Sequence, residues 1–139
     1  MFVGEYRHTI DAKGRTFLPS KLRDGLSECF YIAKGNDPCI CLYSEEEWEK
    51  LTERFNAMPS VQRRHLQRFF YSSADKQSLD TQGRFTLSPE FRKYAGIEKD
   101  AVIVGNNNVI EIWSLDGWEN EQQFLDSENV TNQLLEMGF

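Results

Sequence analysis

The sequence predicts an α+β, mainly β protein in which two similar ββαββ units pair into one pseudo-two-fold barrel with interleaved hairpins and flanking helices. Three features support this prediction: an internal repeat, short segments of alternating apolar and polar residues, and longer segments with a single apolar stripe. The 139 residues are 40% hydrophobic and 13% aromatic, which is enough apolar material to build a core.

A short motif carries the repeat. The pentapeptide Asp11–Arg15 (DAKGR) recurs 69 residues later as Asp80–Arg84 (DTQGR). Further pairs follow in the same order: Leu18 with Leu87, Arg23 with Arg92, Gly35 with Gly105, Ser44 with Ser114, and Trp48 with Trp118. Ordered matches over such a length indicate an internal duplication.

Each copy has the pattern of short strands around a helical turn. Tyr6, His8 and Ile10 share one face of a predicted strand from Glu5 to Ile10. Residues 11–14 form a turn, because aspartate bonds to its own backbone and glycine tolerates positive φ. The other predicted elements are strands at 15–18, 30–33, 39–43, 101–104 and 109–113, and helical turns at 19–25 and 88–96.

Amphipathic helices are predicted after each copy. Ser44 and Glu47 form a capping box that opens the first of them. The apolar stripes consist of Trp48, Leu51, Phe55 and Met58; of Leu66, Phe69 and Phe70; of Leu115, Trp118 and Leu125; and of Val130, Leu134 and Met137. We therefore divide the chain into a first unit (5–47), connecting helices (48–73), a second unit (74–117) and a C-terminal helical segment (118–139). Units this small need partners, so the two copies are expected to pair.

Charge and hydropathy show whether nucleic-acid binding, export or membrane insertion is compatible with the sequence. The net charge is −6, but the eight acidic residues from Asp100 onwards are accompanied by no Lys or Arg. The first 99 residues therefore hold 16 basic residues and 14 of the 22 acidic ones, so a local basic site is compatible with the acidic total. Glu5, Arg7 and His8 argue against a signal peptide, and no apolar run is long enough for a bilayer. We expect a cytoplasmic protein with no membrane partner.

The sequence offers little for catalysis. Its two histidines, His8 and His65, form no metal-binding pair, and no nucleophile or phosphate-loop motif occurs. We predict no enzyme, no cofactor and no small-molecule substrate. Cys39 and Cys41 share one face of a strand, but their spacing matches the usual zinc motifs poorly. Together with Cys29 they are interpreted as structural thiols rather than as a metal site.

The repeated turn is the best candidate for a binding site. Arg15 beside Gly14 places a forked guanidinium where the backbone can approach a ligand closely, and such a fork suits phosphate or the guanine edge. Lys13 adds charge, whereas Gln82 replaces it in the second copy. In an alternative interpretation, each aspartate bridges its arginine only to fix the turn. Two loops related by pseudo-symmetry favour the first interpretation, because paired loops can straddle a nucleic-acid groove.

The motifs Met1-Phe2-x-Gly4-Glu5, Asp11–Arg15, Leu18–Arg23, Asp80-x-x-Gly83-Arg84 and Glu111–Trp113 resemble the MraZ family of bacterial transcriptional regulators. The resemblance implies two SpoVT–AbrB-type domains in a swapped-hairpin (double-psi, AbrB-like) barrel, closed ring oligomers and association with the nucleoid. It also implies binding to short direct repeats in double-stranded DNA upstream of the division and cell-wall gene cluster, including the chain's own promoter. The family's contact motif, D-x-x-x-R, falls on Asp11 with Arg15 and on Asp80 with Arg84.

We therefore expect a sequence-specific DNA-binding regulator that forms a homo-oligomer. Its predicted DNA-binding residues are Arg15, Arg84, Lys13, Asp11, Gly14, Asp80 and Gly83. One rival function is a protein-interaction module, as in antitoxins that share this kind of barrel, with the acidic C-terminal segment holding the partner. A second rival, a hydrolase, lacks any candidate acid or base in the sequence.

Overall fold

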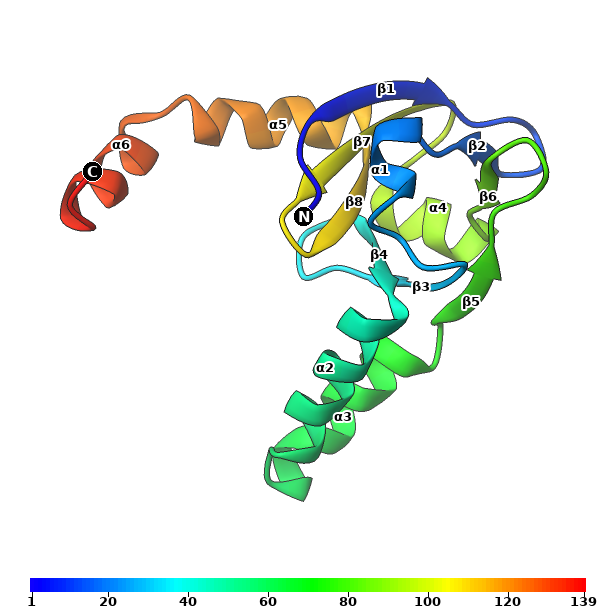
Figure 1. Cartoon of the computed structure of the whole chain (residues 1–139). Coiled ribbons are helices and arrows are strands. Elements are labelled where there is room, and N and C mark those ends of the chain that lie inside the picture. Colours follow the sequence, from blue (N-terminus) through cyan, green and yellow to red (C-terminus); the bar gives the residue numbers. More distant parts are fainter.

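A computed structural model describes all 139 residues and shows an α+β fold dominated by antiparallel strands (Figure 1). The strands are β1 (Glu5–Thr9), β2 (Arg15–Phe17), β3 (Cys29–Lys34), β4 (Ile40–Ser44), β5 (Asp75–Ser78), β6 (Arg84–Thr86), β7 (Asp100–Asn106) and β8 (Val109–Ser114). The helices are α1 (Ser20–Arg23), α2 (Glu45–Asn56), α3 (Ser60–Tyr71), α4 (Pro89–Ala95), α5 (Leu115–Leu125) and α6 (Glu128–Glu136). None of these helices is both long and apolar enough to cross a bilayer.

The two copies exchange strands. Six strands form one sheet in the order β1-β7-β8-β4-β3-β5, and β2 pairs with β6 in a separate two-stranded ribbon. β1 of the first copy thus pairs with β7 of the second, while β5 of the second pairs with β3 of the first. If each strand is replaced by its equivalent in the other copy, the same order is obtained when read from the opposite edge. The sheet therefore has the predicted pseudo-two-fold symmetry.

Backbone hydrogen bonds do not close the sheet and the ribbon into the predicted barrel. The sheet ends at β1 and β5, and β2 and β6 are only three residues long because the chain turns into α1 and α4 soon after them. At the β5 edge, the sheet is joined to the ribbon by a side chain and not by hydrogen bonds between strands. The Gln77 amide donates to the Thr86 carbonyl at 2.7 Å and accepts from the Thr86 N–H at 3.0 Å.

Apolar side chains are buried on both faces of the sheet. The larger cluster packs sheet residues such as Phe30 and Ile103 against Leu22 of α1, Phe91 of α4 and Phe85 of the ribbon. The smaller cluster lies under α5 and consists of Cys39, Cys41, Val102, Trp113 and Trp118. All three cysteines are free thiols; Cys39 and Cys41 are buried as predicted, whereas Cys29 is half-buried.

The helices extend from the sheet as two arms. α2 and α3 form a hairpin, in which Trp48 stacks on Tyr31 with ring centroids 4.6 Å apart and Phe55 contacts Phe70. α5 and α6 form the second arm, on the left in Figure 1. The predicted cap of α2 is confirmed, because Ser44 Oγ accepts the Glu47 N–H at 3.2 Å. Ser114 caps α5 in the same way through the Gly117 N–H.

Candidate nucleic-acid interface

The loop between β1 and β2 is organised around one aspartate. Asp11 Oδ1 accepts the backbone N–H groups of Lys13 and Arg15, both at 2.9 Å. Asp11 Oδ2 accepts the Arg15 Nε–H at 2.7 Å. Gly14 takes φ +83°, a conformation that disfavours residues with a Cβ atom. The local sequence therefore fixes both the turn and the direction of the arginine.

The loop between β5 and β6 repeats this arrangement. Asp80 Oδ1 accepts the backbone N–H groups of Gln82 and Arg84 at 2.9 Å, and Oδ2 accepts the Arg84 Nε–H at 2.8 Å. Gly83 takes φ +81°. The two ion pairs of the alternative interpretation are therefore present. Each occupies only the Nε of its arginine, and neither guanidinium makes a hydrogen bond through its Nη groups.

The β2–β6 ribbon places both arginines on one face. Arg15 lies opposite Thr86 and Arg84 lies opposite Phe17, so these four residues share the outer face of the ribbon. Thr16 and Phe85 occupy the inner face and are each 1% exposed. The Cα atoms of the two arginines are diagonal neighbours, about 7–8 Å apart. The two loops project together at the right of Figure 1.

Two further arginines, which sequence reasoning did not single out, support the loops from beneath. Arg23 Nε donates to the Leu18 carbonyl at 2.9 Å, and its guanidinium occupies the space that a Cβ atom at position 83 would need. Arg92 Nε donates to the Leu87 carbonyl at 3.2 Å and lies beside Gly14. Each arginine thus reaches the loop of the other copy. Their occurrence at equivalent positions of the repeat is the sequence signal that could have identified them.

The backbone links the two loops directly. The Leu18 N–H donates to the Gly83 carbonyl at 2.9 Å, and the Leu87 N–H donates to the Gly14 carbonyl at 2.8 Å. The loops therefore form one unit with few ways to move independently, which is the preorganisation that a binding surface needs.

The two loops differ in charge and exposure. In the first loop, exposed Lys13 forms no ion pair and leaves one positive charge beyond the Asp11–Arg15 pair. The second loop is neutral, since Gln82 takes the place of that lysine. The Arg15 side chain is 35% exposed, whereas the Arg84 side chain is 20% exposed and packs over the Phe17 ring. The first loop is therefore the more cationic and accessible one.

Hydrogen bonds to the charged form stabilise both loop carboxylates. The Arg15 backbone N–H, followed by its side chain, holds the pKa of Asp11 below its ordinary value despite some desolvation. Arg84 lowers the pKa of Asp80 in the same way. Both aspartates are therefore ionised at neutral pH and keep the guanidinium groups in place.

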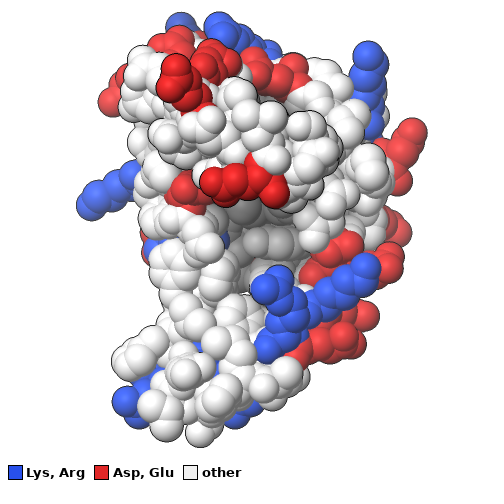
Figure 2. All heavy atoms as spheres, turned by 90° about the vertical axis from the view of Figure 1, so that its left-hand side faces the viewer, with Lys and Arg blue, Asp and Glu red and all other residues white.

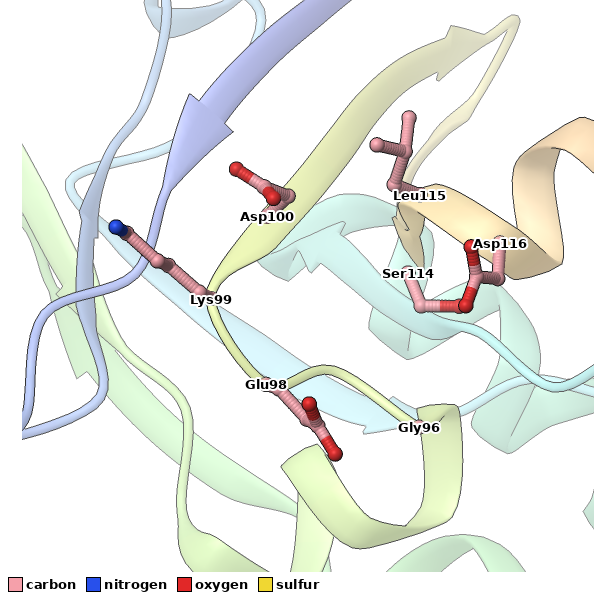
Figure 3. Close-up of a pocket in the computed structure, with 7 residues that line it drawn as sticks. All are labelled: Gly96, Glu98, Lys99, Asp100, Ser114, Leu115 and Asp116. Carbon is pink, nitrogen blue, oxygen red and sulfur yellow. The ribbon is translucent and has the colours of Figure 1, made fainter.

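A pocket between the α4–β7 connection and the start of α5 has no comparable organisation. Glu98, Asp100 and Asp116 line it together with Lys99, and Figure 3 shows these side chains spread apart rather than converging on one point. Ser114, also in the lining, caps α5 with its hydroxyl. The serine of this pocket thus has a structural role as a helix cap.

The acidic C-terminal arm lies away from the loops. In Figure 1, α5 and α6 leave the sheet on the side opposite the two loops. Figure 2 shows this opposite face, where acidic side chains border a hollow that lies between the α5–α6 arm above and the α2–α3 hairpin below. The net negative charge of the chain is thus separated in space from the arginine loops.

Comparisons with known proteins agree with the duplicated sequence. A family model described as "MraZ protein, putative antitoxin-like" matches residues 1–68 and again residues 70–137. The Transcriptional regulator MraZ of Heliobacterium modesticaldum is 42% identical over 98% of both chains. Proteins of the same name from Natranaerobius thermophilus and Clostridium tetani are 41% and 40% identical, over 98% and 99% of each chain respectively.

Proposed function

The chain belongs to the MraZ family of transcriptional regulators, and on that premise we propose that it binds double-stranded DNA through the β1–β2 and β5–β6 loops. The observation that carries this proposal is the common outward face of Arg15 and Arg84, with each Nε held by an aspartate and the Nη groups left for a ligand. No catalytic role is proposed.

The proposed DNA contacts are of two kinds: phosphate contacts that position the protein, and base contacts that recognise the sequence. Lys13 contacts phosphate, which sets the register of the protein on the duplex, while the buried Gly14 and Gly83 shape the loops beneath it. Arg15 and Arg84 enter a groove, where a guanidinium can donate to the O6 and N7 atoms of guanine. The charge difference between the loops gives the first loop the larger share of the phosphate contacts.

One chain offers few contacts, so assembly supplies the affinity. We propose a closed homo-oligomeric ring that presents the loops repeatedly to short direct repeats in a promoter, including that of the division and cell-wall genes and its own. Exposed apolar residues on the two helical arms support the subunit contacts: Val61, Leu66 and Phe69 on α3, and Leu134 and Leu135 on α6. Such a regulator would be cytoplasmic and associated with the nucleoid.

The arginine pair provides the direct test. Arg15→Ala with Arg84→Ala is expected to weaken binding to the chain's own upstream region by about 1–3 kcal/mol per arginine, or roughly 5–150-fold each. The matched control, Arg7→Ala with Lys99→Ala, removes the same charge from exposed sites on β1 and beside β7, outside the helical arms, and is expected to have little effect. Unchanged gel-shift affinity in the loop variant, with assembly intact, would refute the proposal.

Salt dependence separates phosphate contacts from other modes of binding. The logarithm of the apparent affinity should fall linearly with the logarithm of salt concentration, with a slope of about 0.9 per phosphate neutralised. Lys13→Gln, which makes the first loop resemble the second, should reduce that slope by about one phosphate equivalent. Binding that is independent of salt would contradict the loop mechanism.

A second candidate function is protein binding, which the antitoxin-like description of the family model and the exposed apolar side of α6 favour. In that case the acidic arm would hold the partner and the loop arginines would be dispensable. Partner capture that survives the loop substitutions but is lost when α6 is altered would distinguish this function from DNA binding.

A further inference from the structure

Two cysteines and a carboxylate meet on the face of the sheet that α5 covers. Cys41 of β4 lies directly opposite Glu111 of β8, and Cys39 lies two residues before Cys41 on the same face. The two Sγ atoms and a Glu111 carboxylate oxygen all lie within 4.8 Å of one another. From this geometry we propose that Cys39, Cys41 and Glu111 bind one Zn²⁺ ion. The proposal goes beyond DNA binding and does not depend on it.

The spacing of the three donor atoms is close to what zinc requires. With Zn–S bonds of about 2.3 Å and Zn–O bonds of about 2.1 Å, the donors of a tetrahedral site lie about 3.6–3.8 Å apart. Side-chain rotations that move each donor by about 1 Å or less would close the site around the ion. The donors come from the paired central strands β4 and β8, so the backbone already holds them together.

Neighbouring groups orient the carboxylate and leave room for the sulfurs. Trp113 Nε1 donates to Glu111 Oε1 at 3.2 Å, which is the kind of outer contact that fixes a metal-binding carboxylate. Gly35 lies against both sulfurs, and a Cβ atom there would come within 2.8 Å of Cys39 Sγ and 3.1 Å of Cys41 Sγ. Glycine at this position therefore keeps the side of the site next to the sulfurs free.

A cavity adjoins the carboxylate side of the proposed site. It has a volume of about 270 Å³ and is lined by Glu111 together with Asp37, Trp113, Trp118 and Glu121. The two sulfurs do not line it and are nearly inaccessible, with Cys39 1% and Cys41 6% exposed, so Glu111 is the one proposed ligand that meets the cavity. Asp37 and Glu121 add negative charge to this cavity, which favours a cation nearby. In the proposed site, a water molecule on the Glu111 side would complete the four ligands.

Zinc must displace the protons of both thiols, so its apparent affinity for the site should rise with pH. On binding, each thiol loses its proton to solvent, and the electron pair left on sulfur forms the bond to zinc. The divalent cation then offsets the charges of the two thiolates.

Cobalt provides the first readout, because tetrahedral Co²⁺ with thiolate ligands absorbs in the visible and near ultraviolet. Reduced, metal-stripped, full-length protein is titrated with Co²⁺ and then with Zn²⁺. The expected result is one Co²⁺ per chain, a sulfur-to-cobalt charge-transfer band, and loss of that band on displacement by Zn²⁺. Absence of the charge-transfer band would overturn the proposal.

The three cysteines allow a matched comparison. Cys39→Ser and Cys41→Ser should each abolish the charge-transfer band. Cys29→Ser is the control, because the Cys29 sulfur lies on the β3–β5 pair, 3.4 Å from Ser78 Oγ. This control should keep the band at full intensity. A band that survives in Cys41→Ser, or that is lost only in Cys29→Ser, would place the metal elsewhere and refute the site.

Glu111→Gln tests the carboxylate without disturbing the core, since the amide oxygen can still accept the Trp113 N–H. Its zinc affinity should fall by more than the roughly 10–100-fold that is typical when a residue that only orients a metal ligand is changed. Zn²⁺ should raise the Tm of the original chain and raise that of this variant less at the same concentration. An equal rise in both would show that Glu111 is not a ligand, which decides the matter even where the serine variants fail to fold.

Discussion

The aspartate at the start of each loop determines how its arginine is presented. One carboxylate oxygen binds two backbone N–H groups and the other binds Nε, so the turn and the guanidinium are fixed by the same residue. An exposed ion pair of this kind contributes little to stability. In the proposed DNA complex, it would reduce the number of conformations that Arg15 gives up on binding, which improves affinity without new contacts.

Glycine at positions 14 and 83 should respond differently to the same substitution. Both have positive φ, so alanine costs about 1–2 kcal/mol at either site. At Gly14 the new Cβ also meets the Leu87 carbonyl, which is backbone and cannot move aside, whereas at Gly83 it meets the end of the flexible Arg23 side chain. Gly14→Ala should therefore lower the free energy of unfolding more than Gly83→Ala.

Urea unfolding of the two alanine variants measures this difference. Gly96→Ala serves as the control for positive φ alone, because nothing lies within 4 Å of a Cβ atom at that position. An equal loss of stability in all three variants would mean that the contacts around Gly14 have no energetic role.

The pH dependence of the loops follows from the lowered pKa values of Asp11 and Asp80. A carboxyl with a lowered pKa in the folded state stabilises the fold above its ordinary pKa of 3.8, and this contribution is lost as the pH falls through the lower folded value. Carboxyl NMR titration should place both midpoints below 3.8. Arg15→Ala should raise the midpoint of Asp11 only partway, since the backbone N–H remains, and leave that of Asp80 unchanged.

At the scale of individual elements, the sequence predicted those features that depend only on neighbouring residues. The capping box at Ser44, the turns at Asp11 and Asp80, and the short helices after Pro19 and Ser88 all depend on neighbours within a few residues. The partners of Arg23 and of Cys41 lie far along the chain, and no local pattern points to them. Their contacts with Gly83 and Glu111 form only when the two copies pair. Gln77 and Thr86 are nine residues apart within the second copy, but a side chain that bonds to the backbone of the next strand leaves no periodic signal in the sequence.

Gln77 offers a test of how the sheet is joined to the ribbon. Gln77→Ala removes both hydrogen bonds to Thr86 and should lower the free energy of unfolding by about 1–2 kcal/mol. Gln77→Glu keeps the acceptor but loses the donor. It also places a carboxylate against Asp75 Oδ2, which accepts from the Gln77 amide at 2.7 Å, so its cost should exceed that of Gln77→Ala. A neutral Gln77→Ala would show that water replaces the amide at this edge.

For the whole molecule, the proposed assembly depends on the helical arms. Leu135 and Met137 are 63% and 74% exposed, which is unfavourable for an isolated chain. Leu135→Glu with Met137→Glu should reduce the mass measured by light scattering to that of smaller species, with the circular dichroism of each chain retained. Binding to DNA repeats should fall with it, because avidity is lost.

The control for this experiment places the same charge on the same helix. Asn132→Glu with Gln133→Glu alters exposed polar positions of α6 and should leave the assembly intact. Disassembly in both double variants would indicate a general effect of charge on the arm rather than an apolar interface.

The strand exchange also bears on the origin of the chain. Neither half can form the backbone hydrogen bonds of its own edge strand, since β1 pairs only with a strand of the second copy and β5 only with a strand of the first. A polypeptide that corresponds to one half would need a second copy to fill both positions. Cys41 and Glu111 are equivalent positions of the two repeats and face each other across the pseudo-two-fold axis. A single chain can place a sulfur opposite an oxygen there, whereas two identical subunits could not.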